Sequence, residues 1–280
     1  MTRSVILIGG PDSGKTNYVG RLWRALDTGT GALRAAEQPE DIKFVLDVTD
    51  HLFEGSFAPR SEYSDARRDF EVVVAAANGG RCSKVIVPDI SGELWRNAVI
   101  DNEIAPEWSN ELKRADAALL FVRVDSDQDV RPLDWVTSRN MLEKIGDEKD
   151  QGLPTQVMLC ELIHFLEDML ANREDGTLPR LSIVIAAWDL VDTGTFKQGP
   201  VAYLEREYPL VAGRLADLQA LDVKVFGLSV VGGDLKHDSE YRQAFLEAGL
   251  DSQGWVAVFD GDEWRQDSDI TLPIAWAVGL

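Results

Sequence analysis

Cysteine, histidine and long apolar runs are all scarce in this 280-residue chain. Its two cysteines, Cys82 and Cys160, are far apart and match no metal-ligand spacing, and its three histidines are also dispersed. These absences argue against a disulfide framework and a zinc site, and free thiols fit a reducing compartment. No apolar run approaches the roughly 18 residues that suggest a membrane span, and the first residues lead into an expected strand rather than a signal peptide. We therefore expect a cytoplasmic protein that does not associate with membranes.

Positive charge is also in short supply. The chain carries 28 Lys and Arg residues against 48 Asp and Glu residues, which gives a formal net charge of −20. Such a surface repels nucleic acid and anionic lipid, so we expect neither as a partner. A phosphate ligand would have to be bound by nearby hydrogen-bond donors and cations against the repulsion of this negative net charge. Acidity that only maintains solubility is an equally simple interpretation.

Apolar segments alternate with helical patterns along most of the chain. Strands are expected at Ser4–Gly9, Phe70–Ala76, Ser83–Pro88, Ala117–Val124, Leu181–Ala187 and Val223–Val230, and helices at Asn17–Leu26, Glu107–Arg114, Pro154–Asn172 and Val201–Leu218. Several of the strands are nearly continuous in Val, Ile, Leu and Ala, which is typical of strands covered on both faces. The alternation predicts one α/β domain over residues 1–280, a three-layer sandwich with helices on both faces of a mostly parallel six-stranded sheet.

Three stretches interrupt the alternation: 29–69, 126–152 and 232–268. The first is expected to be a long polar loop and the other two to be insertions, because loops of this length are usually functional or carry structure of their own. Within 232–268 the pattern suggests a helix at Ser239–Glu247 and a hairpin that turns at Asp260-Gly261. A short closing helix is expected at Ile270–Ala277.

The segment Gly9–Thr16, GGPDSGKT, lies between an expected strand and an expected helix. Its GxxxxGK[ST] spacing in this context predicts the phosphate-binding loop of a P-loop NTPase. Gly9 and Gly14 permit the required backbone angles, and N–H groups at a helix N-terminus form an anion nest. Lys15 would act catalytically on the terminal phosphates, and Thr16 would bind Mg²⁺. The expected nucleotide contacts are Gly9, Pro11, Asp12, Ser13, Gly14, Lys15, Thr16 and Asn17. A glycine-rich turn with an exposed lysine is the alternative.

A second motif follows in the segment SKVIVPDISGE. Asp89 comes at the carboxyl end of an expected buried strand, the edge at which open α/β sheets bind ligands. We expect Asp89 to reach Mg²⁺, through water. Gly92 completes a DxxG pattern and would present its N–H to a γ-phosphate, while Glu93 would act on the attacking water. An Asp-containing turn after a strand is the simpler interpretation.

The P-loop, the DxxG pattern and a strand that ends in Asp189-Leu190, in this order, resemble the small-GTPase type of the TRAFAC class. In that family the last of these motifs is NKxD, whose Asp pairs with the N1–H and 2-amino group of guanine. The resemblance implies GTP and GDP as ligands with Asp189 as the guanine-recognising residue. Ala186 and Ala187 stand where the family has Asn and Lys, and Trp188 could offer the base an aromatic surface. A helix N-cap at Asp189 is the alternative.

The same resemblance suggests roles for several further residues. Ser229 matches the serine of the family's last base-binding loop. The hydroxyl that binds Mg²⁺ from the first switch loop would be Ser61, with Thr49 as the alternative. Glu93 stands where many relatives carry the glutamine that orients water, and no arginine is placed by motif to stabilise the transition state. We therefore expect slow intrinsic turnover that a partner protein raises.

Four features are similar to the bacterial double-GTPase families of conflict or antiphage systems: Gly-Ser-Phe-Ala-Pro, Asp-Ile-Ser-Gly-Glu-Leu-Trp, the weak base motif and a late Pro-x-x-Trp. This resemblance implies a cytoplasmic switch that engages other proteins of the same system through its switch loops. Two alternatives remain open at this point. One is an ATPase that uses Glu93 as its base, and the other is a scaffold that holds nucleotide without turnover.

Overall fold

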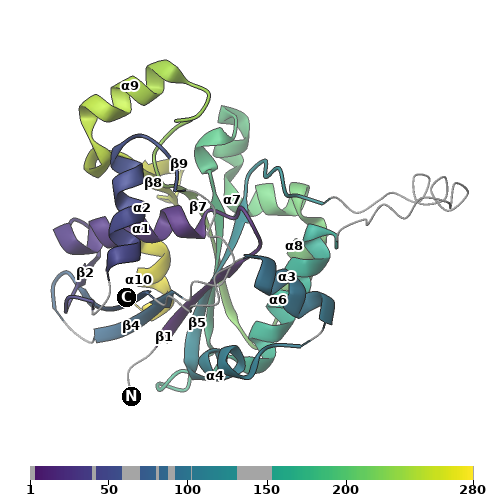
Figure 1. Ribbon diagram of the computed structural model, residues 1–280. Helices are drawn as coiled ribbons and strands as arrows, with labels where there is room; N and C mark the ends of the chain where they lie inside the picture. Colours follow the sequence, from purple (N-terminus) through teal and green to yellow (C-terminus); the bar gives the residue numbers. More distant parts are fainter. Residues whose placement is uncertain are drawn as a thin grey trace, which may run out of the picture.

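A nine-stranded mixed sheet forms the centre of the computed structural model, which describes residues 4–39, 42–58, 70–79, 82–87, 92–101, 103–130 and 153–279 (Figure 1). The strand order is β2-β3-β4-β1-β5-β6-β7-β8-β9. Its parallel centre consists of β4 (Cys82–Val87), β1 (Ser4–Gly9), β5 (Ala115–Arg123), β6 (Arg180–Ala186) and β7 (Asp222–Ser229). The carboxyl ends of these five strands therefore share one edge, where ligands of open α/β sheets bind.

Antiparallel strands extend the sheet on both sides. They are β2 (Leu33–Ala35) and β3 (Phe70–Ala76) on one side, and β8 (Trp255–Phe259) and β9 (Trp264–Asp267) on the other. The predicted six-stranded, mostly parallel sheet is therefore correct for the α/β class but wrong in strand number and in the direction of β3. Only residues 77–81 join β3 to β4, and a parallel connection needs about a dozen residues.

Helices cover both faces of the sheet. One face carries α1 (Lys15–Thr28), α2 (Lys43–Phe53), α9 (Ser239–Ala248) and α10 (Leu272–Val278). The other carries α3 (Gly92–Asp101), α4 (Pro106–Arg114), α6 (Thr155–Met169), α7 (Thr193–Glu207) and α8 (Pro209–Ala216). Figure 1 shows α1 and α2 on the opposite side of the sheet from α3 and α6. Strand β1 serves both layers, since Val5 and Leu7 belong to one apolar cluster and Ile6 and Ile8 to the other.

The stretch 29–69 is not one long loop, because β2 and α2 lie within it. Thr49, the alternative metal ligand, lies in α2 with an exposed fraction of 4%. Its hydroxyl donates to the carbonyl oxygens of Val45 (2.7 Å) and Gly20 (3.2 Å). Thr49 thus ties α2 to α1 inside the protein, and the prediction that it could reach Mg²⁺ is wrong. The other expected ligand, Ser61, lies outside the described residues.

The helix expected at Val201–Leu218 is divided between α7 and α8. Helix α7 begins at Thr193, where the Asp192 side chain accepts the N–H groups of Gly194 (2.7 Å) and Thr195 (2.9 Å). A new helix starts at Pro209, because a residue that precedes proline is biased away from helical geometry. In 232–268, the expected helix and hairpin are confirmed as α9 and the β8–β9 pair. None of the helices in the described part of the chain combines the length and apolar character that crossing a bilayer requires.

Strand β7 packs tightly against the segment that follows β6. A Cβ atom on Gly227 would lie 2.6 Å from Cγ of the fully buried Trp188. We expect Gly227→Ala to destabilise the fold by about 1–3 kcal/mol, because the indole cannot move without disturbing the core. Gly213→Ala is the matched control, since nothing lies within 4 Å of the added carbon on an exposed position of α8. Urea unfolding of both variants checks this, and equal midpoints would contradict it.

Candidate functional site

The loop between β1 and α1 has the backbone geometry of an anion nest. Gly9 (φ 154°), Asp12 (φ 56°) and Gly14 (φ 89°) all adopt positive φ angles, which L-residues other than Asn and Asp rarely tolerate. A Cβ atom on Gly9 would lie 2.9 Å from the carbonyl oxygen of Phe121. Gly9 is therefore favoured by both angle and space and Gly14 by its angle, and the alternative of a simple exposed turn is not supported.

Lys15 is the first residue of α1, and its side chain spans the loop. The Nζ atom donates to the carbonyl oxygens of Gly9 (2.7 Å) and Gly10 (3.1 Å) and contacts the Ser13 hydroxyl at 3.0 Å. The ammonium group is thus held beside the backbone amides of the nest. Positive charge and a helix N-terminus converge here, and both favour a bound phosphate.

Two neighbours of Lys15 connect the loop to the rest of the site. Thr16 follows Lys15 in the first turn of α1. The Asn17 side-chain oxygen accepts the N–H of Ala58 at 3.1 Å, so the chain just before the undescribed residues 59–69 is bound to the start of α1. Asn17 therefore holds this segment near the phosphate loop.

The other metal and switch residues are only partly described. Ser61 and Asp89 lie outside the described residues, as does the side chain of Glu93, while Gly92 begins α3. Within the described part of the chain, no group of three or more His, Cys, Asp or Glu residues is arranged to hold a metal ion. Of the expected Mg²⁺ ligands, Thr16 alone is placed, and its hydroxyl has the hard oxygen chemistry that Mg²⁺ prefers.

Asp189 and Ser229 come together at the carboxyl edge of the sheet. Asp189 lies in the short 3-10 helix Trp188–Leu190 after β6, and Ser229 ends β7. The fully buried Ser229 hydroxyl donates to the Asp189 carboxylate and accepts the N–H of Gly232 at 2.7 Å. These contacts hold the carboxylate in one orientation, although the two residues are 40 positions apart in the chain.

Burial raises the pKa of the half-buried Asp189 above its ordinary value of 3.8. The Ser229 hydrogen bond and the Asp189 backbone N–H oppose this shift, as does the charge of Arg123, whereas the Asp234 charge adds to it. A carboxylate that is costly to ionise gains from a ligand that donates hydrogen bonds to it. Guanine offers two such donors on one edge.

Trp188 does not offer a surface to a ligand. Its side chain is fully buried, and its ring packs edge-on against Tyr203 with centroids 5.3 Å apart. The expectation that Trp188 could stack on a base is therefore wrong. The cause is local, because Ala187 adopts a left-handed conformation (φ 57°) and turns the chain so that the indole enters the core while Asp189 stays at the edge.

Arg123 is a site residue that our sequence analysis did not find. It ends β5, and its Nη1 atom lies 3.0 Å from Oδ1 of Asp12. The Ser126 hydroxyl donates to the other Asp12 oxygen at 3.2 Å. Both oxygens of this carboxylate are thus held, one by the last residue of β5 and one by the turn that follows it. A cation that follows the apolar run 117–122 at the ligand-binding edge was the available signal.

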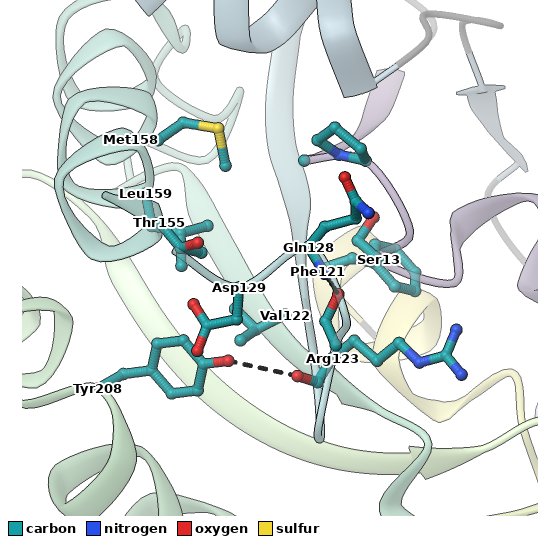
Figure 2. Close-up of a pocket in the computed structure, with 13 residues that line it drawn as sticks. Ser13, Phe121, Val122, Arg123, Gln128, Asp129, Thr155, Met158, Leu159 and Tyr208 are labelled. Atoms are coloured by element: carbon teal, nitrogen blue, oxygen red, sulfur yellow. Dashed lines mark hydrogen bonds between the residues drawn. The ribbon is translucent and has the colours of Figure 1, made fainter. Parts of the chain in front are cut away.

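A cavity of about 40 Å³ lies beside the phosphate loop (Figure 2). Ser13 lies on one side of it and Met158 and Tyr208 on the other in Figure 2, and Gly10 and Pro11 also line it. Figure 2 shows the Tyr208 hydroxyl, which donates to the carbonyl oxygen of Arg123 at 3.3 Å, and the Arg123 guanidinium extending away from it. The cavity has room for about one water molecule, so it is too small to be a nucleotide site.

Of three comparisons with known proteins, one identifies the family of this chain. A search of curated proteins finds no match. Among solved structures, a chain of the signal recognition particle receptor SRb-GTP/SRX complex from Chaetomium thermophilum is 14% identical, with a TM-score of 0.39 over 88% of this chain and 98% of that one. This likeness is too weak to bear on function. The family model described as Double-GTPase 1 (DO-GTPase1) matches residues 6–277. Because this match spans nearly the whole chain, the protein belongs to the Double-GTPase 1 family.

Proposed function

We propose that this protein is a Mg²⁺-dependent switch that binds GTP and hydrolyses its β–γ phosphoanhydride. Membership of a GTPase family supports GTP binding. The observation that carries the proposal is the position of two subsites on one sheet edge, the phosphate loop after β1 and the Asp189–Ser229 pair after β6 and β7. Together they suit a ligand with phosphates at one end and hydrogen-bond donors at the other.

The phosphate end would be bound by the nest and by Lys15. The chain's formal charge of −20 repels a triphosphate, so the local donors must outweigh that field. They can do so because backbone amides and an ammonium act at hydrogen-bond distance, whereas distant carboxylates are screened beyond about 10 Å. Mg²⁺ would neutralise charge on the β- and γ-phosphates, with Thr16, Asp89 and Ser61 as its protein ligands or water-bound neighbours.

The base end would be bound by Asp189. Its ionised carboxylate accepts hydrogen bonds, and guanine presents an N1–H and a 2-amino group to it. Adenine has an acceptor at N1 and no amino group at C2, so it would leave Asp189 unpaired and repelled. A buried polar group that loses its partner rejects the wrong ligand strongly. The proposal therefore includes selectivity for GTP and GDP over adenine nucleotides.

Hydrolysis would use the residues after β4. We assign the Gly92 N–H to the γ-phosphate and Glu93 to the attacking water, with Lys15 on the terminal phosphates. A carboxylate beside the anionic γ-phosphate favours slow turnover, and a partner protein that supplies an arginine would raise it. We place this switch in the cytoplasm, where it would act with other proteins of a bacterial defence system through its switch segments. In this proposal, residues 1–280 form one GTPase domain.

Titration calorimetry with Mg²⁺ tests the central claim. We expect GTP and GDP to bind at least about 100-fold more tightly than ATP, as the loss of two paired donors implies. EDTA should weaken GTP binding, because the phosphates then lose their counter-charge. Equal affinity for GTP and ATP would refute the guanine assignment, and no binding of any nucleotide by folded protein would refute the whole proposal.

One observation favours an ATPase instead. Ala186 and Ala187 replace the Asn and Lys of the resembled family, so guanine recognition depends on fewer groups. An ATPase would hydrolyse ATP rapidly, and Glu93→Gln would abolish turnover while ATP binding persists. The same calorimetry decides between the two functions, since an ATPase would bind ATP at least as well as GTP.

A further inference from the structure

The base subsite lacks two groups at the positions where the resembled family carries them. Ala186 and Ala187 provide neither an amide to tie the base subsite to the phosphate loop nor a cation to cover the base. The methyl group of Ala186 instead packs beside the loop, 3.2 Å from where a Cβ atom on Gly14 would lie. If the site binds guanine nucleotide, another residue has to supply the missing charge.

Arg123 lies beside the first of these alanines. In the parallel pairing of β5 with β6, Arg123 is the register partner of Ala186, and the N–H of Val124 donates to the Ala186 carbonyl oxygen at 3.0 Å. Register partners on parallel strands are about 4.8 Å apart, and their side chains leave the same face of the sheet. Arg123 is also two residues beyond Phe121, the partner of Gly9. Its side chain therefore starts on the face where the phosphate loop lies.

Asp12 determines where the guanidinium group lies. The Nη1–Oδ1 distance is 3.0 Å, and Ser126 holds the second oxygen of Asp12. The pair is partly sheltered, with side-chain exposures of 31% for Arg123 and 24% for Asp12. One contact uses one of five guanidinium donors and leaves the planar group able to stack on an aromatic ring.

The charge of Arg123 also acts on the base-recognising carboxylate. It lowers the pKa of Asp189, whereas Asp234 raises it, and Arg123 also pairs with Asp12. We propose that Arg123 binds the nucleotide directly, as the positively charged wall of the guanine subsite, in place of the lysine that Ala187 replaces. Asp12 holds it in position and thereby joins the base subsite to the phosphate loop. The proposal rests on the guanine-nucleotide function above.

Ligands with and without a base test this role. Arg123→Ala should weaken GTP and GDP about tenfold, the worth of a partly desolvated cation–π contact. Affinity for inorganic triphosphate, which has no base, should stay within about twofold of wild type, because the nest and Lys15 remain. Arg123→Lys keeps the cation and should recover most of the GTP affinity. Calorimetry with Mg²⁺ measures all of these values.

Arg24→Ala is the matched control. Arg24 has a similar side-chain exposure of 32% and pairs with Asp251 through two contacts of 2.7 and 2.6 Å, on a part of α1 away from the phosphate loop. It should leave GTP affinity unchanged. Melting temperatures without nucleotide should fall no further in Arg123→Ala than in Arg24→Ala. A larger fall, or equal losses for GTP and inorganic triphosphate, would show that Arg123 only supports the loop and would overturn the proposal.

A double-mutant cycle tests the role of Asp12. Asp12→Asn keeps a residue type that tolerates positive φ, and it should weaken GTP binding less than Arg123→Ala does. If Asp12 acts by holding Arg123, the double variant should bind GTP about as well as Arg123→Ala alone. Additive losses of GTP affinity in the double variant would overturn the role of Asp12 in holding Arg123. If wild type binds no GTP, the proposed function itself fails, whereas unchanged GTP binding in Arg123→Ala refutes this inference alone.

Discussion

Lys15→Ala is expected to lower the affinity for GTP and GDP by about 100-fold or more. The ammonium group is fixed beside the nest by its contacts with Gly9, Gly10 and Ser13, so it meets a phosphate without first having to be ordered. Truncating one partner of a buried charge pair costs about 2–5 kcal/mol, and each 1.4 kcal/mol is tenfold in affinity. Titration calorimetry with Mg²⁺ measures the loss.

The control for this prediction is Lys197→Ala. Lys197 is exposed on α7, so its removal changes the net charge by the same amount without touching the loop. The GTP affinity of Lys197→Ala should match that of the wild type. Because the acidic chain repels nucleotide, each lost cation also weakens binding slightly through the long-range field, and the Lys197 variant measures that contribution. An equal loss in both variants would mean that the P-loop assignment is wrong.

Asp189→Asn is expected to reverse base selectivity. The asparagine oxygen can still accept the N1–H, but its amide would face the 2-amino group donor to donor, so GTP affinity should fall about 100-fold or more. Xanthosine triphosphate has a carbonyl at C2, which the amide can meet as a donor. We therefore expect the variant to bind it more tightly than wild type does. Competition titrations with GTP and xanthosine triphosphate measure this change in base selectivity.

The thermal stability of Asp189→Asn distinguishes a loss of guanine recognition from unfolding of the protein. Burial raises the folded-state pKa of Asp189 above its unfolded value, so the ionised carboxylate destabilises the folded protein at neutral pH. That cost disappears as the pH falls through the folded pKa, and also when the group is a neutral asparagine. Nucleotide-free Asp189→Asn should therefore melt no lower than wild type. Asp217→Asn, at an exposed position, is the control for loss of one charge. Unchanged GTP affinity in Asp189→Asn would refute guanine recognition by this residue.

Sequence reasoning succeeded where the information is local. The predicted phosphate loop lies within eight consecutive residues, which run from Gly9 at the end of β1 to Lys15 and Thr16 in the first turn of α1. The apolar strands β1, β5 and β6 were recognisable because burial on both faces leaves nearly continuous Val, Ile, Leu and Ala. The placement of Asp189 at the end of a strand followed from the same pattern.

Sequence reasoning failed where contacts with residues far away along the chain determine the local structure. Residues 33–35 become a strand because the edge of β3 is available to pair with them, and Thr49 enters the core because α2 packs on α1. Trp188 was considered as an aromatic surface for the base, but its side chain is buried after the positive φ of Ala187. No pattern within these short segments predicts such packing, because their partners lie far away along the chain.

The amino-acid sequence by itself determined the α/β class, the glycine-rich loop between β1 and α1, and the position of Asp189 at the end of a strand, because each depends on residue type and on spacing along a few neighbouring positions. Tertiary structure alone decided which distant groups share the site. Ser229 orients Asp189, and Arg123 reaches Asp12, because adjacent parallel strands end at one edge of the sheet. That adjacency follows from strand order and register, which long-range hydrogen bonding and burial select together.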